Sequence, residues 1–206
     1  MKVALIGGTG VFGRALGQRM QALGIDVLIG SRDPERAREL ALVYGVSGGA
    51  NEDVARVADL VILSVPGRAA VDTARGLADA IGSTPVVSVA SDLRFTEAGV
   101  LPGRLGRSLA EEVAEVLAAP VAAGFQSLAA AHLAAPEPPD EDVLVCGDEF
   151  AAKDVALEIG ARLVRGRAID AGPLANARAL EAMTAVILNV NRRYGARAGI
   201  RLTGIP

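Results

Sequence analysis

A glycine-rich segment near the start of the chain, residues 8–13 (GTGVFG), constrains the fold more than any other feature. It fits the pattern G-x-G-x-x-G and directly follows residues 3–6 (VALI), an apolar run typical of a buried parallel strand. Residues 11–23, which come next, have the pattern of an amphipathic helix that ends before a glycine. This context of strand, tight turn and helix is the one in which the motif binds a dinucleotide.

Each glycine of the motif has a separate physical reason. Gly8 permits the tight turn, Gly10 lets the backbone approach a pyrophosphate, and Gly13 lets the helix pack closely on the strand. The N-terminus of the helix then offers free N–H groups and a partial positive charge to an anion. The motif therefore predicts a dinucleotide site at the first turn of the fold.

The end of the second predicted strand, residues 25–29, indicates which dinucleotide binds. Enzymes that use NAD usually carry an acidic residue there, which holds the ribose 2′-hydroxyl. This chain has Gly30, Ser31 and Arg32 instead, with Arg36 one helical turn further on. A hydroxyl and two guanidinium groups favour a 2′-phosphate, so NADP is predicted. The alternative is that Asp33 holds a ribose hydroxyl, although its position before a proline also fits the N-cap of the next helix.

Strand-like and helix-like segments alternate along the rest of the chain, which predicts a Rossmann-type doubly wound α/β fold with a parallel sheet. We expect residues 1–135 to form the dinucleotide-binding domain. Residues 136–206 are expected to be a small C-terminal α/β extension that completes the substrate cleft and a dimer interface. The further strands are expected at residues 60–65, 85–89, 121–125, 143–146 and within 161–171. One further helix is expected to start at residues 33–35, and others are expected at 68–81, 108–118, 149–160 and 174–194.

Composition excludes several other classes of protein. A formal net charge of −3 and a pI near 5.3 argue against nucleic-acid binding. One cysteine and one histidine make a disulfide framework or a metal site improbable. Residues 116–136 lack Asp, Glu, Lys and Arg, but they are rich in alanine and contain prolines, so a membrane span is not expected. We expect a cytoplasmic protein with a small-molecule substrate.

Six segments together resemble the NADPH-dependent reductases of coenzyme F420, a deazaflavin. The resemblance runs in order along nearly the whole chain and implies a Rossmann domain, a homodimer, and hydride transfer between NADP(H) and C5 of F420. The segments are residues 7–10 (GGTG), 30–32 (GSR), 64–66 (SVP), 145–148 (VCGD), 170–174 (DAGPL) and 187–194 (ILNVNRRY).

The resemblance also implies roles for individual residues. One group would bind the cofactor: Gly8, Thr9, Gly10, Val11, Phe12 and Gly13 at the pyrophosphate, Ser31, Arg32 and Arg36 at the 2′-phosphate, and Val65, Pro66 and Ala130 near the nicotinamide. A second group would contact the deazaflavin: Gln126, Ser127, Leu128, Gly172, Pro173 and Leu174.

The chain departs from the family pattern on the substrate side. Gln126 stands where relatives commonly have a histidine, and Ala129 stands where they often have Pro or Ser. Hydride transfer needs aligned rings and exclusion of water rather than a protein nucleophile, so Gln126 is a candidate for positioning. Two alternatives remain open at this point: a reductase of another acceptor (imine, ketone or flavin), and a module that senses NADP(H) without turnover.

The remaining candidates have ordinary structural explanations beside the functional ones. For His132, a structural role as a packed or half-exposed residue is favoured over a catalytic role. Cys146 is expected to be a small buried apolar residue within a strand. Four arginines are candidates for an anionic tail of the substrate or for a solvated surface: Arg68, Arg94, Arg104 and Arg107.

Overall fold

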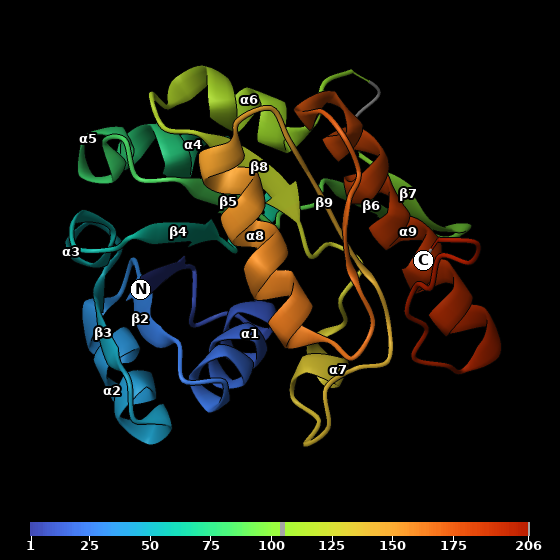
Figure 1. Cartoon of the computed structure of the whole chain (residues 1–206), viewed down its shortest axis with the longest axis horizontal. Coiled ribbons are helices and arrows are strands. Elements are labelled where there is room, and N and C mark those ends of the chain that lie inside the picture. The colour runs from blue at the N-terminus through green and yellow to red at the C-terminus, as the bar shows by residue number, and fades with distance from the viewer. Residues whose placement is uncertain (104–105, 206) are drawn as a thin grey trace.

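The computed structural model describes residues 1–103 and 106–205, and it has one central sheet with helices on both faces (Figure 1). The sheet has eight strands in the order β10-β9-β8-β5-β4-β1-β2-β3, and every neighbouring pair is parallel except β8 with β9. The Rossmann-type α/β prediction is therefore confirmed. The strands are β1 Lys2–Ile6, β2 Asp26–Ser31, β3 Ser47–Ala50, β4 Leu60–Leu63, β5 Val86–Ser88, β8 Val121–Gly124, β9 Val143–Gly147 and β10 Ala168–Asp170.

Two helical layers bury the two faces of this sheet. Helices α1 (Val11–Ala22), α2 (Pro34–Tyr44) and α8 (Phe150–Leu163) cover one face. Helices α3 (Asn51–Arg56), α4 (Gly67–Gly76), α5 (Ala78–Ile81) and α6 (Leu109–Val116) cover the other. Because both faces are covered, β1 and β4 are continuous apolar runs rather than alternating ones.

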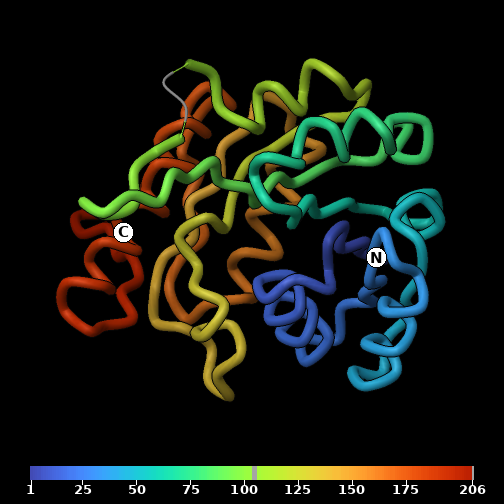
Figure 2. The backbone as a smooth tube through the Cα atoms, turned by 180° about the vertical axis from the view of Figure 1, so that it is seen from behind, coloured from blue at the N-terminus to red at the C-terminus, as the bar shows by residue number. Residues whose placement is uncertain are grey.

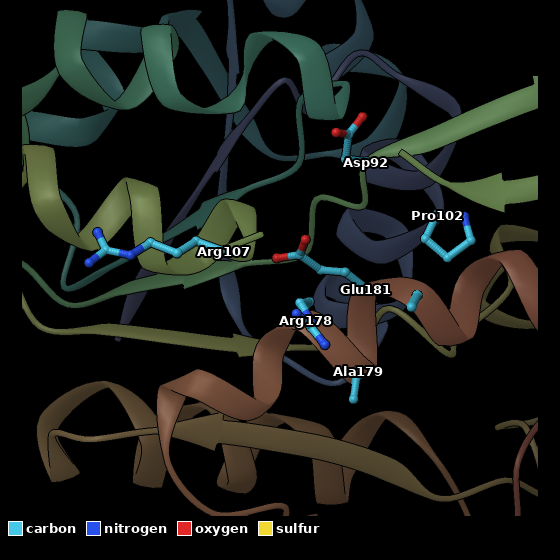
Figure 3. Close-up of a pocket in the computed structure, with 7 residues that line it drawn as sticks. Asp92, Pro102, Arg107, Arg178, Ala179 and Glu181 are labelled. Atoms are coloured by element: carbon cyan, nitrogen blue, oxygen red, sulfur yellow. The ribbon is translucent and has the colours of Figure 1, made fainter. Parts of the chain in front are cut away.

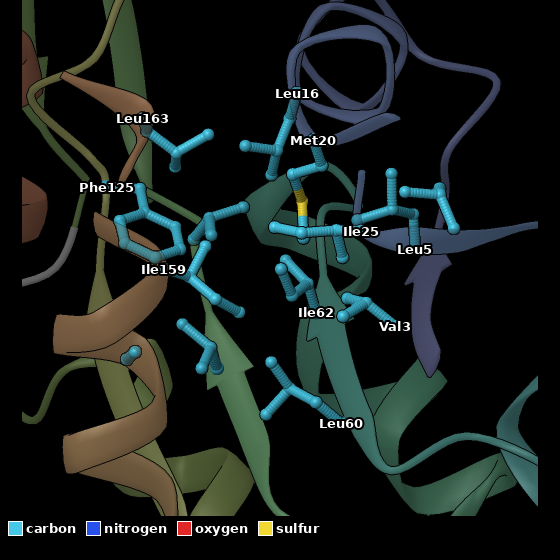
Figure 4. Close-up of a cluster of buried hydrophobic side chains, with 14 of the residues drawn as sticks. Val3, Leu5, Leu16, Met20, Ile25, Leu60, Ile62, Phe125, Ile159 and Leu163 are labelled. Carbon is cyan, nitrogen blue, oxygen red and sulfur yellow. The ribbon is translucent and has the colours of Figure 1, made fainter. Parts of the chain in front are cut away.

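The first layer meets around a cluster of buried side chains that includes residues far apart in sequence. Figure 4 shows Leu16 and Met20 of α1 in one cluster with Ile159 and Leu163 of α8 and with Phe125, which follows β8. All five side chains are at most 1% exposed. Residues 143–164 therefore belong to the same core as the glycine-rich motif, because α8 and β9 complete this layer.

A third, smaller cluster attaches the end of the chain to the sheet. The short helix η1 (Leu174–Asn176) and the long helix α9 (Ala177–Tyr194) pack on β8, β9 and α6 through Leu174, Ala177 and Leu180. Figure 2, seen from behind, shows that the two ends of the chain lie at opposite sides of the molecule. Within the described parts of the chain, no helix combines the length and the apolar character that crossing a membrane requires.

Several elements differ from the sequence predictions. The predicted strand within residues 161–171 is limited to β10, because α8 continues to Leu163. The helix predicted for residues 68–81 is divided at Leu77 into α4 and α5. Five elements were not predicted: β3, α3, the short helix α7 (Ala130–Leu133), and the strands β6 (Leu93–Thr96) and β7 (Gly99–Pro102), which form an antiparallel hairpin.

The direction of β9 matters for the site. In register with β8, Gly124 pairs with Val145 and Ala122 pairs with Gly147, so β9 runs in the opposite direction. The connection between them contains only the short α7, and it returns at the edge where β8 ends. As a result, β1, β2, β4, β5 and β8 end at one edge of the sheet, whereas β9 and β10 end at the opposite edge.

Candidate functional site

The glycine-rich turn joins β1 to α1 as the sequence predicts. The N–H of Gly8 donates to the carbonyls of Leu5 (3.0 Å) and Gly30 (3.1 Å), which ties the turn to β1 and β2. A Cβ at Gly13 would lie 2.8 Å from the Cα of Gly8, so a side chain there would force the helix away from the turn. Gly8 and Gly13 thus shape the turn without lining a cavity.

The N-terminus of α1 is open to an anion. Gly10 is its N-cap and has no side chain, and the first turn contains no acidic residue. The first helical bond runs from the N–H of Arg14 to the carbonyl of Gly10 (2.9 Å). The N–H groups of residues 11–13 therefore have no partner earlier in the helix, and they point toward the sheet edge where the strands end.

A cavity of about 350 Å³, here called the Arg32 pocket, lies between the end of β2 and the start of α4. Three arginines line it, Arg32 and Arg36 on one wall and Arg68 on the other. The other lining residues are Gly7, Thr9, Gly10, Ser31, Asp33, Asn51, Ser64, Val65, Pro66, Ala69 and Thr73. The pocket brings together the three residues predicted to bind a 2′-phosphate, namely Ser31, Arg32 and Arg36.

Asp33 and Gly30 both affect the charge of this pocket. The Asp33 carboxylate accepts a hydrogen bond from the N–H of Arg36 (3.1 Å), so it caps α2, as one of the two sequence interpretations holds. At Gly30, a Cβ would lie 2.8 Å from Oδ1 of Asn51 and 2.9 Å from Cγ2 of Val54. An acidic side chain at the strand end, where NAD enzymes place one, would therefore have to displace Asn51 and Val54.

A second cavity, of about 340 Å³, here called the Gln126 pocket, adjoins the first. The two pockets share Gly10, Ser64, Val65 and Pro66, so they form one cleft along the sheet edge. Its remaining lining is largely apolar: Val11, Phe12, Gly67, Val89, Ala90, Ser91, Leu93, Phe125, Gln126, Leu128 and Thr184.

Hydrogen bonds fix the position of Gln126. Its Nε2 donates to the carbonyl of Ser88 at the end of β5 (3.0 Å), so the amide is oriented with Oε1 on the other side. Its own backbone carbonyl accepts from the hydroxyl of Thr184 on α9 (3.1 Å). Since Thr184 donates there, the Ser91 hydroxyl 2.9 Å away must donate to Thr184. These hydrogen bonds connect Gln126 with the end of β5, with α9 and with the loop that contains Ser91.

Phe125 turns the chain into this pocket. It is fully buried and has φ = 72°, the left-handed region that a bulky residue rarely adopts. The N–H of Leu128 donates to its carbonyl (3.0 Å), which closes the turn after β8. Such backbone strain persists where the surrounding packing enforces it, and it is common at functional sites.

Other predicted site residues lie outside the cleft. Gly172 accepts a hydrogen bond from the N–H of Gly147 (3.1 Å), which is in register with Ala122 near the start of β8. The segment 172–174 therefore begins at the edge of the sheet opposite to the cleft, and Leu174 is buried in the third cluster. Ser127 and Ala130 lie close to Gln126 in the sequence, but neither lines the Gln126 pocket.

His132 and Cys146 have structural environments. Nδ1 of His132 lies 3.1 Å from Oε1 of Glu141, a buried carboxyl whose pKa is raised above its usual value by burial. Neither residue lines the cleft. Cys146 is buried and free, and burial raises the pKa of its thiol to about 12. At neutral pH it is an inert apolar residue.

The arginine candidates separate in the structure. Arg68 lines the Arg32 pocket, Arg94 lies on β6, and Arg107 pairs with Glu115, while Arg104 falls outside the described residues. Arg107 also lines a separate cavity of about 290 Å³ (Figure 3). Buried Glu181, which lines the same cavity, accepts hydrogen bonds from the N–H groups of Leu109 and Ala110 (3.1 Å each) and so caps α6.

Sequence reasoning missed several residues that line the cleft, including four polar ones. Asn51 follows a strand of only four residues, SGGA, which has no apolar pattern. Thr73 and Thr184 are polar residues within helices, and Thr184 interrupts the buried face of α9. Ser64, whose hydroxyl donates to the carbonyl of Ile6 (3.0 Å), was quoted only as part of a motif.

Comparison with known proteins agrees with this geometry. Residues 2–92 match the family model described as NADP oxidoreductase coenzyme F420-dependent. The chain is 36% identical to the F420-dependent NADP reductase of Methanothermobacter thermautotrophicus over 100% of this chain and 96% of the relative. It is 34% identical to the enzyme of the same name from Methanocaldococcus jannaschii, over 100% of this chain and 99% of the relative.

Solved structures share the fold. A crystal structure from Arthrobacter sp. FB24, described as a candidate F420-dependent NADP-reductase, has a TM-score of 0.85 and 25% identity, covering 98% of this chain and 99% of that one. An imine reductase from Streptomyces aurantiacus, at 21% identity and a TM-score of 0.63, covers 95% of this chain and 62% of that one and shares the fold alone. The full-length identity to two curated reductases confirms the resemblance: this chain belongs to the F420-dependent NADP reductase family.

Proposed function

We propose that this enzyme transfers hydride between NADP(H) and coenzyme F420 in the cleft formed by the Arg32 and Gln126 pockets. The observation that carries the proposal is the continuity of these two pockets through Gly10 and residues 64–66. One end is cationic and suits a phosphorylated nucleotide, and the other is largely apolar and suits flat rings. The two coenzymes supply the redox chemistry, and the protein binds them, aligns them and excludes water.

The nucleotide would occupy the Arg32 pocket and the open N-terminus of α1. Thr9, Gly10 and the N–H groups of residues 11–13 face its pyrophosphate, and Ser31, Arg32 and Arg36 face its 2′-phosphate. Guanidinium groups hold a phosphate by paired charge-assisted hydrogen bonds, which a ribose hydroxyl cannot replace. Val65 and Pro66 lie where the two pockets meet, so they are assigned to the nicotinamide ribose.

The hydride acceptor would occupy the Gln126 pocket. Gln126 holds it in position, because an amide forms hydrogen bonds but does not exchange a proton at neutral pH. Leu128 and Thr184 complete the wall, so residues 136–206 contribute to the cleft through α9. Residues 172–174 are omitted from this site, since their segment begins at the other edge of the sheet.

The direct test is loss of F420 absorption when NADPH is added to the purified protein, with NADH in a parallel reaction. We expect rapid bleaching with NADPH and little with NADH, because the cleft has cations for a 2′-phosphate and no acid for a 2′-hydroxyl. No bleaching, with NADPH still bound, would leave another acceptor or a sensing role.

The same assay examines the acceptor wall through Gln126→Leu. Losing the bond to Ser88 is expected to lower the rate with F420 about tenfold while the Kd for NADPH stays unchanged. Gln18→Leu, an exposed glutamine on α1, is the matched control. An equal loss of NADPH binding would assign Gln126 to the nucleotide side.

We further propose a homodimer that works in the cytoplasm. Five large apolar side chains are exposed on α9 and the hairpin, namely Phe95, Leu101, Val186, Val190 and Tyr194. Such a patch favours association with a second chain, and the free buried Cys146 fits a reducing compartment. Light scattering is expected to give about twice the 21.0 kDa mass of the chain. A mass of one chain would contradict the dimer, and cell fractionation tests the location.

A further inference from the structure

Arg68 lies on a different element from the predicted phosphate-binding residues but lines the same pocket. It is the second residue of α4, which begins directly after β4 and residues 64–66. Because β4 and β2 flank β1 on opposite sides, the start of α4 forms the wall of the Arg32 pocket that faces Arg32 and Arg36. Three arginines from two walls therefore line one cavity of about 350 Å³.

No protein partner in the described residues uses the charge of Arg68. Its side chain is exposed to solvent and has no ion pair among residues 1–103 and 106–205. Arg75, on the same helix, instead pairs with Asp72 at 2.7 Å. The acidic residue that lines the pocket is Asp33, whose carboxylate already caps α2.

A cluster of arginines around one pocket favours binding of an anion. Their side chains are exposed, so solvent screens the repulsion between them, and a bound anion removes what repulsion remains. A phosphate monoester carries nearly two negative charges at neutral pH and accepts hydrogen bonds on three oxygens, so it can satisfy guanidinium groups from both sides. The pyrophosphate, by contrast, meets the backbone N–H groups at the start of α1.

We infer that Arg68 is a specificity-determining residue that binds the 2′-phosphate of NADP(H) from the wall opposite Arg32 and Arg36. The inference rests on the proposed function and adds to it a cation from α4. Arg68 was one of four arginines considered for the anionic tail of the deazaflavin, and the inference assigns it to the nucleotide instead. The pocket thus encloses the 2′-phosphate between two helices, α2 and α4, rather than holding it on one side.

Binding of NADPH and NADH to Arg68→Met, followed by nucleotide fluorescence, tests the inference. Methionine keeps most of the apolar stem and removes the charge. We expect the Kd for NADPH to rise about tenfold and the Kd for NADH to stay within about twofold, since charge-assisted hydrogen bonds to one phosphate are lost. Arg68→Lys is expected to recover part of the affinity for NADPH. Arg75→Met, from the same helix, is the matched control and should bind both nucleotides as the wild type does.

Two results would overturn the role of Arg68. One is an equal loss of affinity for NADPH and NADH, which would place Arg68 at the adenine or the pyrophosphate. The other is unchanged binding of both nucleotides while Arg32→Met weakens NADPH. If Arg32→Met and Arg36→Met also leave NADPH binding unchanged, the proposed nucleotide site itself fails, so the two failures are distinguishable.

Discussion

Arg32→Glu is expected to lower kcat/KM for NADPH by more than about a hundredfold and to leave the low activity with NADH nearly unchanged. The change removes the guanidinium group proposed to bind the 2′-phosphate and puts a negative charge in its place. Losing a charge-assisted hydrogen bond costs about 1.5–3 kcal/mol, and the repulsion between carboxylate and phosphate adds to it. Each 1.4 kcal/mol is a factor of ten, which gives the expected size.

Arg38→Glu is the control for this substitution. Arg38 is exposed on the same helix, α2, but does not line either pocket. Arg38→Glu changes the net charge by the same amount as Arg32→Glu. A general electrostatic effect on nucleotide binding would therefore be equal in both variants. Steady-state rates with both nucleotides measure the difference. Equal losses with NADPH and NADH in Arg32→Glu would show that Arg32 does not act on the 2′-phosphate.

The part of the cleft proposed for the nucleotide can be predicted from sequence, because segments close together in the chain form it. The glycine-rich turn, the start of α1 and the end of β2 lie within the first 36 residues, and each has a short pattern with a clear physical meaning. The sequence shows that no acidic residue stands at position 30, but it does not show which neighbouring side chains crowd that position. Asn51 and Val54 occupy the space, and both come from α3, an element that sequence patterns do not indicate.

The substrate half depends on strand directions that patterns do not encode. The alternation of strands and helices predicts parallel strands throughout, yet β9 returns antiparallel to β8. That one reversal moves residues 172–174 to the far edge of the sheet, although their motif resembles that of relatives. Thr184 and Arg68 enter the cleft from helices whose position depends on tertiary packing, so neither could be assigned to it from spacing alone.

The second large effect is on the stability of the fold, and it depends on Asp142, the residue directly before β9. Its carboxylate is fully buried and accepts hydrogen bonds from the backbone and side chain of Arg167 and from the N–H of Leu202. The Arg167 guanidinium also donates to the carbonyls of Leu202 and Ile205. One buried carboxylate thus attaches residues 200–205 to the sheet.

Asp142→Ala is expected to lower the free energy of unfolding by about 3 kcal/mol, which corresponds to a fall in Tm on the order of 10 °C. The reason is that two backbone N–H groups and a guanidinium group lose their acceptor together. Asp140→Ala is the control, because Asp140 forms an exposed pair with Arg201 (2.6 Å) that contributes about 1 kcal/mol at most. Thermal unfolding followed by circular dichroism measures both, and similar falls in Tm would contradict the role of Asp142.

The stabilising effect of Asp142 is expected to depend on pH, and comparing Asp142→Ala with the wild type measures this dependence. Hydrogen bonds from Arg167 hold the pKa of Asp142 far below its usual value of 3.8. A carboxyl with a lowered pKa in the folded state stabilises the fold above its unfolded pKa, and it loses this contribution as the pH falls further. The difference in Tm between wild type and Asp142→Ala should therefore be constant above about pH 5 and shrink below pH 3.8. A difference in Tm that stays constant down to pH 2 would show that the ionised carboxylate is not what holds residues 200–205.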